Sequence, residues 1–326
     1  MRRGVILPTL LTAVAVLAPD PLRAAFDEAQ AVPGESRATP QADVEVVQVT
    51  SDVYMIGGAG ANITVQVGSQ GLFVVDTGSE AMSAQTVAAI RRISDKPIRY
   101  IVNTSADAEH TGGNAAVDKL GAFIPTRELI EEGAVIIAHE NVLRRMSAPT
   151  GKIAPTPVAA WPTATFFVAQ KDMNVNNQAV QLLHQPAAHT DGDVMVMFRR
   201  SDVIAAGDVF DKTRYPVIDL QRGGSIKGEI DAINRLLNLM VTGEKEEGGT
   251  MVVPGHGRVC DEHEVSEYRD MLTIVRDRVL DLIKKGMSLA QVKEARPSFE
   301  YDPEYGPSDA FIEAVYTSLR GAGNGS

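Results

Sequence analysis

The sequence predicts an α/β fold, and three of its features support this prediction. Short apolar or alternating segments, which are typical of strands, are interspersed with longer segments of helical periodicity. Turn-forming glycines separate these segments, and several strand-like segments end in polar residues beside glycine. Because strands that alternate with helices form layered structures, we expect sheets that are covered by helices.

The segment from residue 44 onward begins with strands and a helix. Residues 61–67 alternate between apolar and polar side chains, as in a strand with one buried face. Residues 72–75 are continuously apolar, as expected of a strand that is covered on both faces. A helix is predicted over 80–93, and another buried strand over 98–102.

The remainder of the chain continues with both kinds of element. A helix is predicted over 127–146, a loop over 148–163 and a second helix over 228–241. Apolar residues at three- and four-residue steps predict a long helix that ends before Gly286. Further strands are predicted at 165–168, 179–183, 194–198, 203–206 and 250–253, and further helices after the capping-box pattern of Ser288 and Gln291 and over 308–319.

The composition favours one sizeable globular domain with an acidic surface. The chain has 326 residues, of which 44% are hydrophobic and 22% charged, and its formal net charge is −11. This charge argues against nucleic acid as a partner. The length suits one sizeable globular domain or two fused half-domains. We predict one domain over 44–320, whose extent is that of the family resemblance described below, followed by a disordered tail over 321–326. Cys260 is the single cysteine, which excludes an intramolecular disulfide.

The N-terminus has the pattern of a secretory signal peptide. Two arginines near the start precede an apolar run over 4–18, and residues 22–24 offer a cleavage site. The run is short for a membrane span, so an uncleaved anchor is the weaker alternative. We predict a signal peptide over 1–24, a flexible leader over 25–43, and a periplasmic or secreted protein with no stable membrane span after cleavage.

Four polar residues lie where strand-like segments end next to glycine. His110 and His189 lie in loop-like segments, and His256 lies between two glycines. Asp208 follows the strand predicted at 203–206. Proteins with α/β scaffolds build their sites from polar residues at strand ends. One such residue is a weak signal, but all four in this order indicate a functional site.

The motifs around these residues resemble those of the metallo-β-lactamase superfamily. The resemblance covers roughly 44–320 and implies a four-layer αββα sandwich. The C-terminal helices and the stretch over 214–219 look like those of an exported branch of the family. The segments that carry the resemblance are Val75-Asp76-Thr77-Gly78, Asn103-Thr104, His110-Thr111-Gly112-Gly113, His189-Thr190-Asp191-Gly192, Gly207-Asp208 and Pro254-Gly255-His256-Gly257.

One motif of the family is degenerate in this chain. The family has His-x-His-x-Asp-His, and here Ser105 replaces the first His, Asp107 the second and Glu109 the Asp. Only His110 of this run is intact. Ser105 is a poor zinc ligand, and a carboxylate displaced by about 1 Å can cost about a hundredfold in rate. Asp76 has a family counterpart near the site and is expected to shape the backbone rather than bind metal.

The family resemblance implies a site for two zinc ions that share a carboxylate. A catalytic zinc site needs about three protein ligands and a water. We therefore predict one zinc ion rather than two, and the oxygen-rich ligand set leaves manganese or iron as alternatives. The residues carried over are His189 and Asp107 for the first ion, His110, His256 and Glu109 for the second, and Asp208 as the shared carboxylate.

Two functions are compatible with this site. The first is a hydrolase in which metal-activated water attacks an ester, thioester, lactone or amide of a small-molecule substrate, with Glu109 and Asp208 as catalytic residues. The second is a non-catalytic pseudoenzyme that binds a ligand or a protein partner in the former cleft. The changes at Ser105 and Asp107 favour the second function, and the four retained strand-end residues favour the first. The oligomeric state is not indicated.

Two further histidines and a glycine-rich segment have structural interpretations. His139 lies within the helix predicted over 127–146 and is expected to be structural. His184 ends a predicted strand and is a candidate neighbour of His189. No helix follows Gly57-Gly58-Ala59-Gly60, so this segment is interpreted as a mobile hairpin loop over the site rather than as a phosphate-binding loop.

Overall fold

The structure of the chain is a computed structural model. The predicted signal peptide over 1–24, the leader over 25–43 and residues 323–326 of the tail lie outside the described residues, and export therefore stays a prediction. The described residues are 44–122, 133–147, 152–243 and 248–322.

Twelve strands in the described residues form two sheets. The first sheet has its strands in sequence order; β1 to β4 pair antiparallel, and β4 to β7 pair parallel. The second has the order β12-β11-β10-β9-β8, in which only β11 and β12 pair parallel. The strands are β1 (Glu45–Gln48), β2 (Val53–Gly57), β3 (Ile63–Val67), β4 (Leu72–Val75), β5 (Ile98–Val102), β6 (Val135–His139), β7 (Ala164–Phe166), β8 (Gln170–Val175), β9 (Gln178–Gln185), β10 (Asp193–Phe198), β11 (Val203–Asp211) and β12 (Met251–His256).

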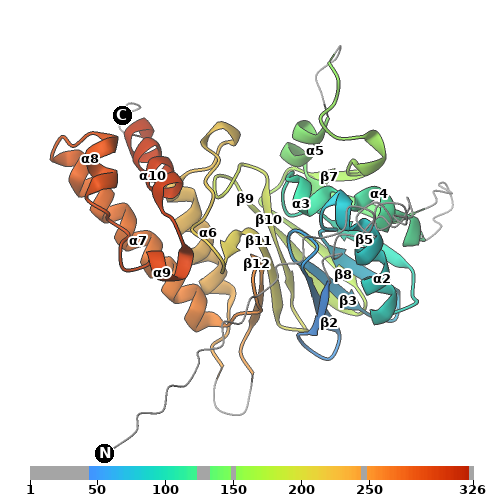
Figure 1. Ribbon diagram of the computed structural model, residues 1–326. Coiled ribbons are helices and arrows are strands. Elements are labelled where there is room, and N and C mark those ends of the chain that lie inside the picture. The colour runs from blue at the N-terminus through green and yellow to red at the C-terminus, as the bar shows by residue number, and fades with distance from the viewer. Residues whose placement is uncertain (1–43, 123–132, 148–151, 244–247, 323–326) are drawn as a thin grey trace, which may run out of the picture. The chain divides into compact units, whose positions relative to one another are not determined.

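Helices cover the outer faces of both sheets (Figure 1). Figure 1 shows α2 and α4 on the side of the first sheet and α6, α7 and α10 on the side of the second. The helices are α2 (Ser83–Ile93), α3 (Ala108–Thr111), α4 (Asn114–Val117), α5 (Glu140–Met146), α6 (Ile226–Leu239), α7 (Glu262–Lys284), α8 (Leu289–Glu294), α9 (Asp302–Tyr305) and α10 (Asp309–Ala322).

The main hydrophobic cores lie between these layers. The core between the sheets includes Phe73 of β4 and Phe198 of β10, whose rings meet edge to face with 5.5 Å between their centroids. Ala89 and Ile90 of α2 pack on the outer face of the first sheet. The helices α6, α7 and α10 pack on the outer face of the second. This order of layers confirms the predicted four-layer αββα sandwich.

The segment after residue 133 differs from its prediction. Instead of one helix over 127–146, the chain forms β6 and then α5, which begins at Glu140. The β-branched residues at the start of β6 favour a strand, and β6 pairs with β5 and β7. Residues 127–132 of the predicted helix lie outside the described part of the chain.

The C-terminal helices form as predicted. Helix α7 ends before Gly286, which adopts a φ of 79°. Ser288 and Gln291 cap α8 through a reciprocal capping box. The strands β1, β2 and β8 are absent from the prediction. The side chains of β1 and β8 are largely exposed, so these strands lack a clear hydrophobic pattern.

His139 and His184 form a stacked pair between β6 and β9. Their ring centroids lie 3.6 Å apart with an interplanar angle of 7°, and His139 is 4% exposed. His139 Nδ1 accepts a hydrogen bond of 3.3 Å from the Asn141 N–H, so His139 caps α5 instead of lying within a helix. His184 Nε2 lies 2.8 Å from the Asp191 carbonyl. Both ring nitrogens of His189 bond to other residues, so His184 is not its direct partner.

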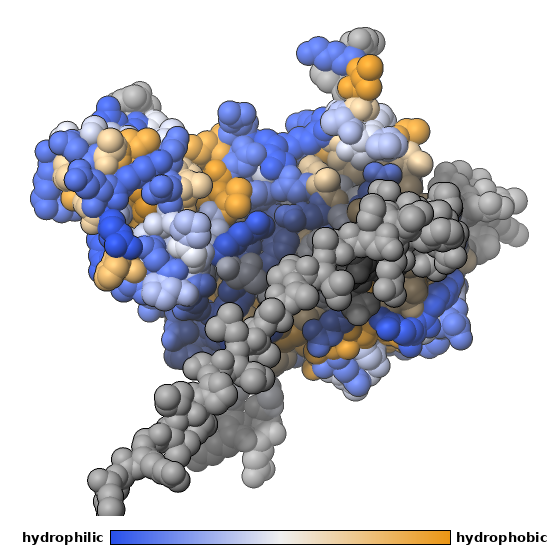
Figure 2. All heavy atoms as spheres, viewed as in Figure 1, coloured by the Kyte–Doolittle hydropathy of each residue, from blue (hydrophilic) through white to orange (hydrophobic). Residues whose placement is uncertain are grey.

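The surface on the face shown in Figure 2 is mainly hydrophilic, and its hydrophobic side chains form small separate groups. Scattered exposed hydrophobic residues of this kind are normal in globular proteins. Among the described segments, no helix combines the length and the apolar character that a membrane crossing needs. The large exposed hydrophobic residues are Ile153, Val158, Phe167, Val168, Val217, Val241, Ile274 and Phe299.

Acidification should weaken the fold through His139. Burial, together with the neighbouring His184, lowers the pKa of His139 from 6.5 to about 4, although Asp191 opposes this shift. Between these two values the unfolded chain binds a proton on His139 that the folded chain does not bind. Stability from this group is therefore fully present above pH 6.5 and is lost as the pH falls toward 4.

Urea unfolding across this pH range checks the expectation. We expect His139→Phe, which keeps a ring in the stack but cannot be protonated, to show a smaller fall in the free energy of unfolding than the unmodified chain. His263→Phe is the control, because the side chain of His263 is 77% exposed on α7. Equal slopes for the unmodified chain and His139→Phe would contradict the expectation.

Candidate metal centre

Strand ends of both sheets meet at one edge of the sandwich. The carboxyl ends of β4 and β5 point the same way, as do those of β11 and β12, because each pair is parallel. The Val194 N–H at the start of β10 donates to the carbonyl of Thr104 after β5 at 2.9 Å, which joins the sheets here. Gly207 in β11 has a φ of 55°, and a Cβ on it would lie 2.7 Å from the Thr104 side chain. Glycine at 207 therefore lets β11 pass close to the end of β5.

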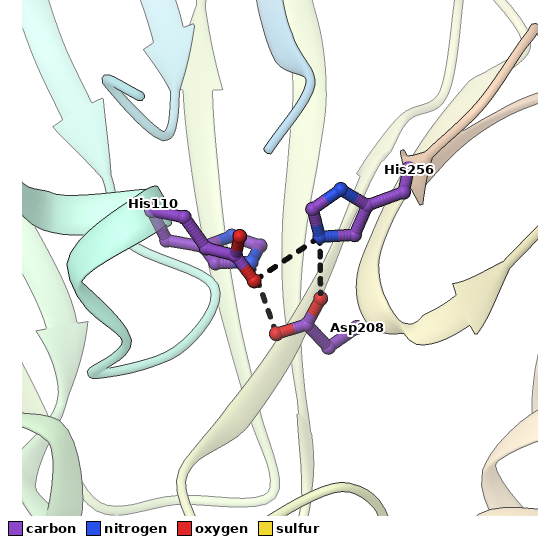
Figure 3. A group of neighbouring side chains, drawn as sticks. His110, Asp208 and His256 are labelled. Carbon is purple, nitrogen blue, oxygen red and sulfur yellow. Dashed lines mark ion pairs between the residues drawn. The ribbon is translucent and has the colours of Figure 1, made fainter. Parts of the chain in front are cut away.

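Asp208 lies at the centre of this edge and is surrounded by three imidazoles. Its side chain is 9% exposed. Figure 3 shows His110 and His256 approaching the carboxylate from different segments. Asp208 Oδ2 lies 3.0 Å from His110 Nε2 and 3.7 Å from His189 Nε2, and Oδ1 lies 3.6 Å from His256 Nε2.

The orientation of His110 is fixed by Asp76, which follows β4. Asp76 Oδ2 lies 2.8 Å from His110 Nδ1. The same carboxylate accepts hydrogen bonds from the N–H and the hydroxyl of Thr104, at 2.8 and 2.6 Å. A hydrogen on Nδ1 directs the lone pair of Nε2 toward Asp208. Asp76 therefore holds both the backbone at Thr104 and the ring of His110, and the sequence did not predict the second of these contacts.

Glu109 and His256 complete a group of four potential ligands. Glu109 Oε1 lies 3.2 Å from His256 Nε2. Each residue of the group offers a ligand atom, and these atoms all lie within 4.8 Å of one another. The structure therefore brings together residues that the sequence assigned to the second ion and to the shared carboxylate. The group consists of Glu109, His110, Asp208 and His256.

The glycine-rich loop after β2 packs against this group. The Ala61 N–H donates to the carbonyl of Glu109 at 3.2 Å, and the Asn62 N–H donates to the carbonyl of Gly255 at 2.7 Å. The Ser79 N–H donates to the carbonyl of Ala59 at 2.7 Å. These bonds anchor the loop that the sequence predicts to be mobile, and they fix the backbone on both sides of the ligand group.

The donor set of this group fits one divalent cation. The Nε2 atoms of His110 and His256 are buried and lie 3.0 and 3.2 Å from carboxylate oxygens of Asp208 and Glu109, but neither makes a hydrogen bond of good geometry with a described residue. A buried polar atom without a partner is unfavourable, and a metal ion is one way to satisfy it. Two imidazoles and two carboxylates are nitrogen and oxygen ligands of the kinds that zinc binds in sets of about four.

Electrostatic interactions couple Asp208 to the imidazoles around it. Burial raises the pKa of Asp208, but the charge on His110, and then those on His189 and His256, lower it well below its usual range. Burial lowers the pKa of His110, but the carboxylates of Asp208 and Asp76 raise it well above the ordinary value. Because a proton and a metal ion need the same lone pair of His110 Nε2, metal binding at this group should release a proton.

The other predicted ligand group consists of Asp107, His189 and Asp208. Two of these side chains, Asp107 and His189, already pair with each other and with further protein groups. Its potential ligand atoms also lie within 4.8 Å of one another. However, His189 Nε2 lies 2.7 Å from Asp107 Oδ2, and His189 Nδ1 lies 2.6 Å from the carbonyl of Val217. Asp107 Oδ1 accepts a hydrogen bond from Arg222. Since carboxylates and carbonyls only accept, both His189 nitrogens carry hydrogens in this arrangement. A metal ion here would have to displace the hydrogen on Nε2 and also compete with Arg222 for Asp107.

The charges of this group agree with its hydrogen bonds. Burial raises the pKa of Asp107, but the hydrogen bonds from His189 and Arg222 outweigh burial and lower it from 3.8 to about 2. Burial lowers the pKa of His189, but the hydrogen bond to Asp107 and the nearby carboxylates raise it from 6.5 to about 10. The Ser105 hydroxyl accepts a hydrogen bond of 3.2 Å from the Asp107 N–H. These contacts make the group a poorer fit for a metal ion than the group of Glu109, His110, Asp208 and His256.

A polar cleft of about 200 Å³ lies beside both groups. A larger and mainly apolar pocket of about 670 Å³ adjoins the cleft, because Asp107 and Glu109 line both. The charged residues that line the polar cleft, in addition to His189, are Asp107, Glu109, Asp208, Asp211, Arg214 and Arg222.

Arg214 and Arg222 belong to the site, and the sequence did not predict them. Arg214 Nε donates to Asp211 Oδ2 at 2.7 Å, and its Nη2 lies 3.6 Å from Glu109 Oε1. Both arginines follow β11 in a segment without a metal-binding motif. The available signal was indirect. The carboxylate at 107 replaces a neutral imidazole, and together with Glu109 it lies beside other acids, so these groups need cationic partners when partly buried.

Comparisons with known proteins identify the family of the chain. A family model described as the metallo-beta-lactamase superfamily matches residues 56–256. A linear primary-alkylsulfatase from Pseudomonas sp. (strain ATCC 19151) is 24% identical over 265 residues, which cover 69% of this chain and 48% of the relative. The chain therefore spans about half the length of that curated relative.

Solved structures share the fold at low sequence identity. A stereoselective inverting sec-alkylsulfatase from Pseudomonas sp. has a TM-score of 0.62 at 15% identity, over 84% of this chain and 50% of that one. A metallo-beta-lactamase from Pontibacter korlensis has a TM-score of 0.53 at 18% identity, over 71% of this chain and 99% of that one. These similarities support the sandwich fold.

Replacing Asp76 by Asn should weaken metal binding without unfolding the chain. Asn tolerates the φ of 61° at this position and can still accept from Thr104. It removes the charge that holds the Nδ1 hydrogen of His110, and loss of such an outer contact typically lowers metal affinity about 10- to 100-fold. Zinc affinity measured by chelator competition checks this. Asp231→Asn, at an exposed ion pair on α6, should bind zinc like the unmodified chain.

Proposed function

Because the chain belongs to the metallo-β-lactamase superfamily, we propose that it is a hydrolase with one divalent metal ion, held by the second ligand group. Zinc is the first candidate, and manganese or iron are alternatives because half of the ligands are carboxylates. The proposed ligands are Glu109, His110, Asp208 and His256.

One observation carries this proposal. The buried Nε2 atoms of His110 and His256 converge with two carboxylates, and neither nitrogen makes a hydrogen bond of good geometry with a described residue. A group that served only to stabilise the fold would be expected to form well-aligned hydrogen bonds at such atoms. The convergence of two imidazoles and two carboxylates within 4.8 Å therefore supports a cation-binding role.

The side chains of the site have different roles in the proposed reaction. A divalent cation bound here would polarise a substrate oxygen and lower the pKa of a nearby water molecule. Asp76 keeps His110 in the tautomer that has its lone pair on Nε2. Asp208 holds the ligands from separate segments together. Glu109 lines the polar cleft with a side chain that is 39% exposed, so it is the carboxylate placed to accept a proton from water entering the cleft.

The cleft supports a small-molecule substrate with a polar group next to an apolar part. The polar cleft of about 200 Å³ holds the reacting group, and the adjoining apolar pocket of about 670 Å³ holds the rest. Esters, thioesters, lactones and amides fit this description. Alkyl sulfate esters are a further candidate substrate class, because two of the similar proteins are named alkylsulfatases.

A second candidate function is ligand binding without catalysis. The ion pairs of Asp107 with His189 and Arg222 favour it, because they replace half of the two-metal arrangement that the family resemblance implies. The cleft would then bind a ligand or a protein partner without hydrolysis. Metal content and turnover distinguish the two functions.

We expect the full-length chain to bind one zinc ion when it is purified from zinc-supplemented medium. His110→Ala and His256→Ala should each lose most of this zinc, because each removes one of two imidazole ligands. His263→Ala is the matched control, since His263 lies on α7 and is 77% exposed. Elemental analysis by mass spectrometry measures the content. Absence of metal from the unmodified chain after zinc or manganese supplementation would count against the hydrolase.

Hydrolysis should follow the metal content. The assay panel contains esters, thioesters, lactones, amides and alkyl sulfates, and the unmodified chain should hydrolyse at least one of these classes. His110→Ala should hydrolyse it at least about a hundredfold more slowly, because a catalytic metal lowers the activation free energy by several kcal/mol. Addition of a chelator should abolish turnover, and zinc should restore it. A chain that binds one zinc ion but hydrolyses none of the panel would support the ligand-binding function.

A further inference from the structure

Arg222 contacts a residue that the family resemblance assigns to the first metal ion. Its Nη1 donates to Asp107 Oδ1, while Asp107 Oδ2 pairs with His189 Nε2 at 2.7 Å. Asp107 and His189 are the residues that the resemblance assigns to that ion. Both oxygens of Asp107 are therefore engaged by nitrogen atoms of other side chains, and a permanently charged guanidinium lies in contact with the same carboxylate that a metal would need.

The position of Arg222 is built into the fold. Arg222 ends a short 3-10 helix over Leu220–Arg222 that is capped by Asp219. Asp219 accepts from the Arg222 N–H at 2.9 Å and from its Nε at 2.6 Å. The Arg222 carbonyl in turn accepts from the Asp191 N–H at 2.9 Å and from Arg145 Nη2 at 2.8 Å. The guanidinium therefore has a fixed place beside the cleft.

The turn that follows Arg222 packs tightly against the segment of His189. A Cβ on Gly224 would lie 2.2 Å from the carbonyl oxygen of His189, so only glycine allows this approach. The Asp219 N–H also donates to that carbonyl at 2.9 Å. The backbone of the turn that carries Arg222 is therefore held against the segment of His189.

The guanidinium also faces the cleft. Its side chain is 31% exposed and lines the polar cleft together with Asp208. Nε and Nη1 are bonded to Asp219 and Asp107, whereas Nη2 makes no hydrogen bond to a described residue. Nη2 is therefore free to donate to an oxygen of a molecule in the cleft.

We propose that the Arg222 guanidinium takes the place of the first metal ion: it keeps this half of the site free of metal, and it presents a fixed positive charge to a carbonyl or anionic oxygen of the substrate. The second part rests on the proposed hydrolase function, whereas the first part concerns metal binding alone. The charge of Arg222 repels a cation at Asp107. The contact between His189 Nε2 and Asp107 Oδ2 occupies the other atoms with which these two residues could bind a metal.

The metal count tests the first part. With zinc alone as the probe, the unmodified chain should bind one ion. Ser105→His with Asp107→His supplies the missing imidazoles but should still bind one ion, because Asp219 keeps Arg222 in place. Adding Arg222→Ala to this pair should raise the count to two. Two ions in the double variant, or one ion in a folded triple variant, would overturn the proposal.

Arg222→Ala alone provides a second measurement if the triple variant does not fold. This change frees Asp107, and we expect a weak second zinc ion to appear at excess zinc in calorimetric titrations. Arg276→Gln, on α7, is the control and should keep a count of one. An unchanged single-ion titration for Arg222→Ala would contradict the proposal.

Kinetics test the second part in chains loaded with one equivalent of zinc. Arg222→Gln should lower kcat/KM by roughly a hundredfold to a thousandfold, as for loss of one donor to a reacting oxygen. Arg222→Lys should recover part of this loss, because it keeps the charge without the planar fork. An Arg222→Gln enzyme with unchanged kcat/KM would overturn this part. If the chain hydrolyses no substrate but shows the expected metal counts, the proposed hydrolase function is refuted. The first part of the proposal, that Arg222 keeps this half of the site free of metal, is then supported.

Discussion

The contact of the buried Asp208 carboxylate with three imidazoles connects the segments on which the site depends. His110, His189 and His256 come from separate segments of the chain, and each places a ring nitrogen within 3.7 Å of this carboxylate. Imidazoles that carry positive charge would repel one another at such a distance without a shared anion. The approach of β11 to Thr104, which Gly207 permits, puts the anion in place. The geometry of both ligand groups therefore follows from one packing constraint between two strands.

The two sides of Asp208 balance charge by different means. On one side, His110 and His256 present nitrogens that can take a proton or a metal ion. On the other, Arg222 and a doubly protonated His189 balance the charges of Asp107 and Asp219. Cationic side chains thus compensate the carboxylates on this side, whereas the nitrogens on the first side remain available to a metal ion.

Sequence patterns located the strand-end residues but not the ion pairs among them. His110, His189, Asp208 and His256 could be found because local strand patterns and adjacent glycines mark strand ends. Arg222 could not, because it lies 115 positions from Asp107 and no spacing rule connects them. The apolar run of β6 was assigned to a helix, since a short buried run has no period that separates strand from helix. The stacking of His139 on His184 likewise depends on sheet packing that the sequence does not encode locally.

The backbone around the ligand group is held independently of any metal. Asp76 fixes Thr104, and the loop before Asn62 is hydrogen-bonded to the segments of Glu109 and Gly255. The fold therefore does not depend on His110 and His256, whose Nε2 atoms lie beside carboxylates without a hydrogen bond of good geometry. A buried polar atom without a good hydrogen bond costs up to about 1–3 kcal/mol, which is large against a typical net stability of about 5–15 kcal/mol. A bound cation would satisfy both nitrogens at once, so metal binding at this half of the site explains the geometry better than a purely structural role does.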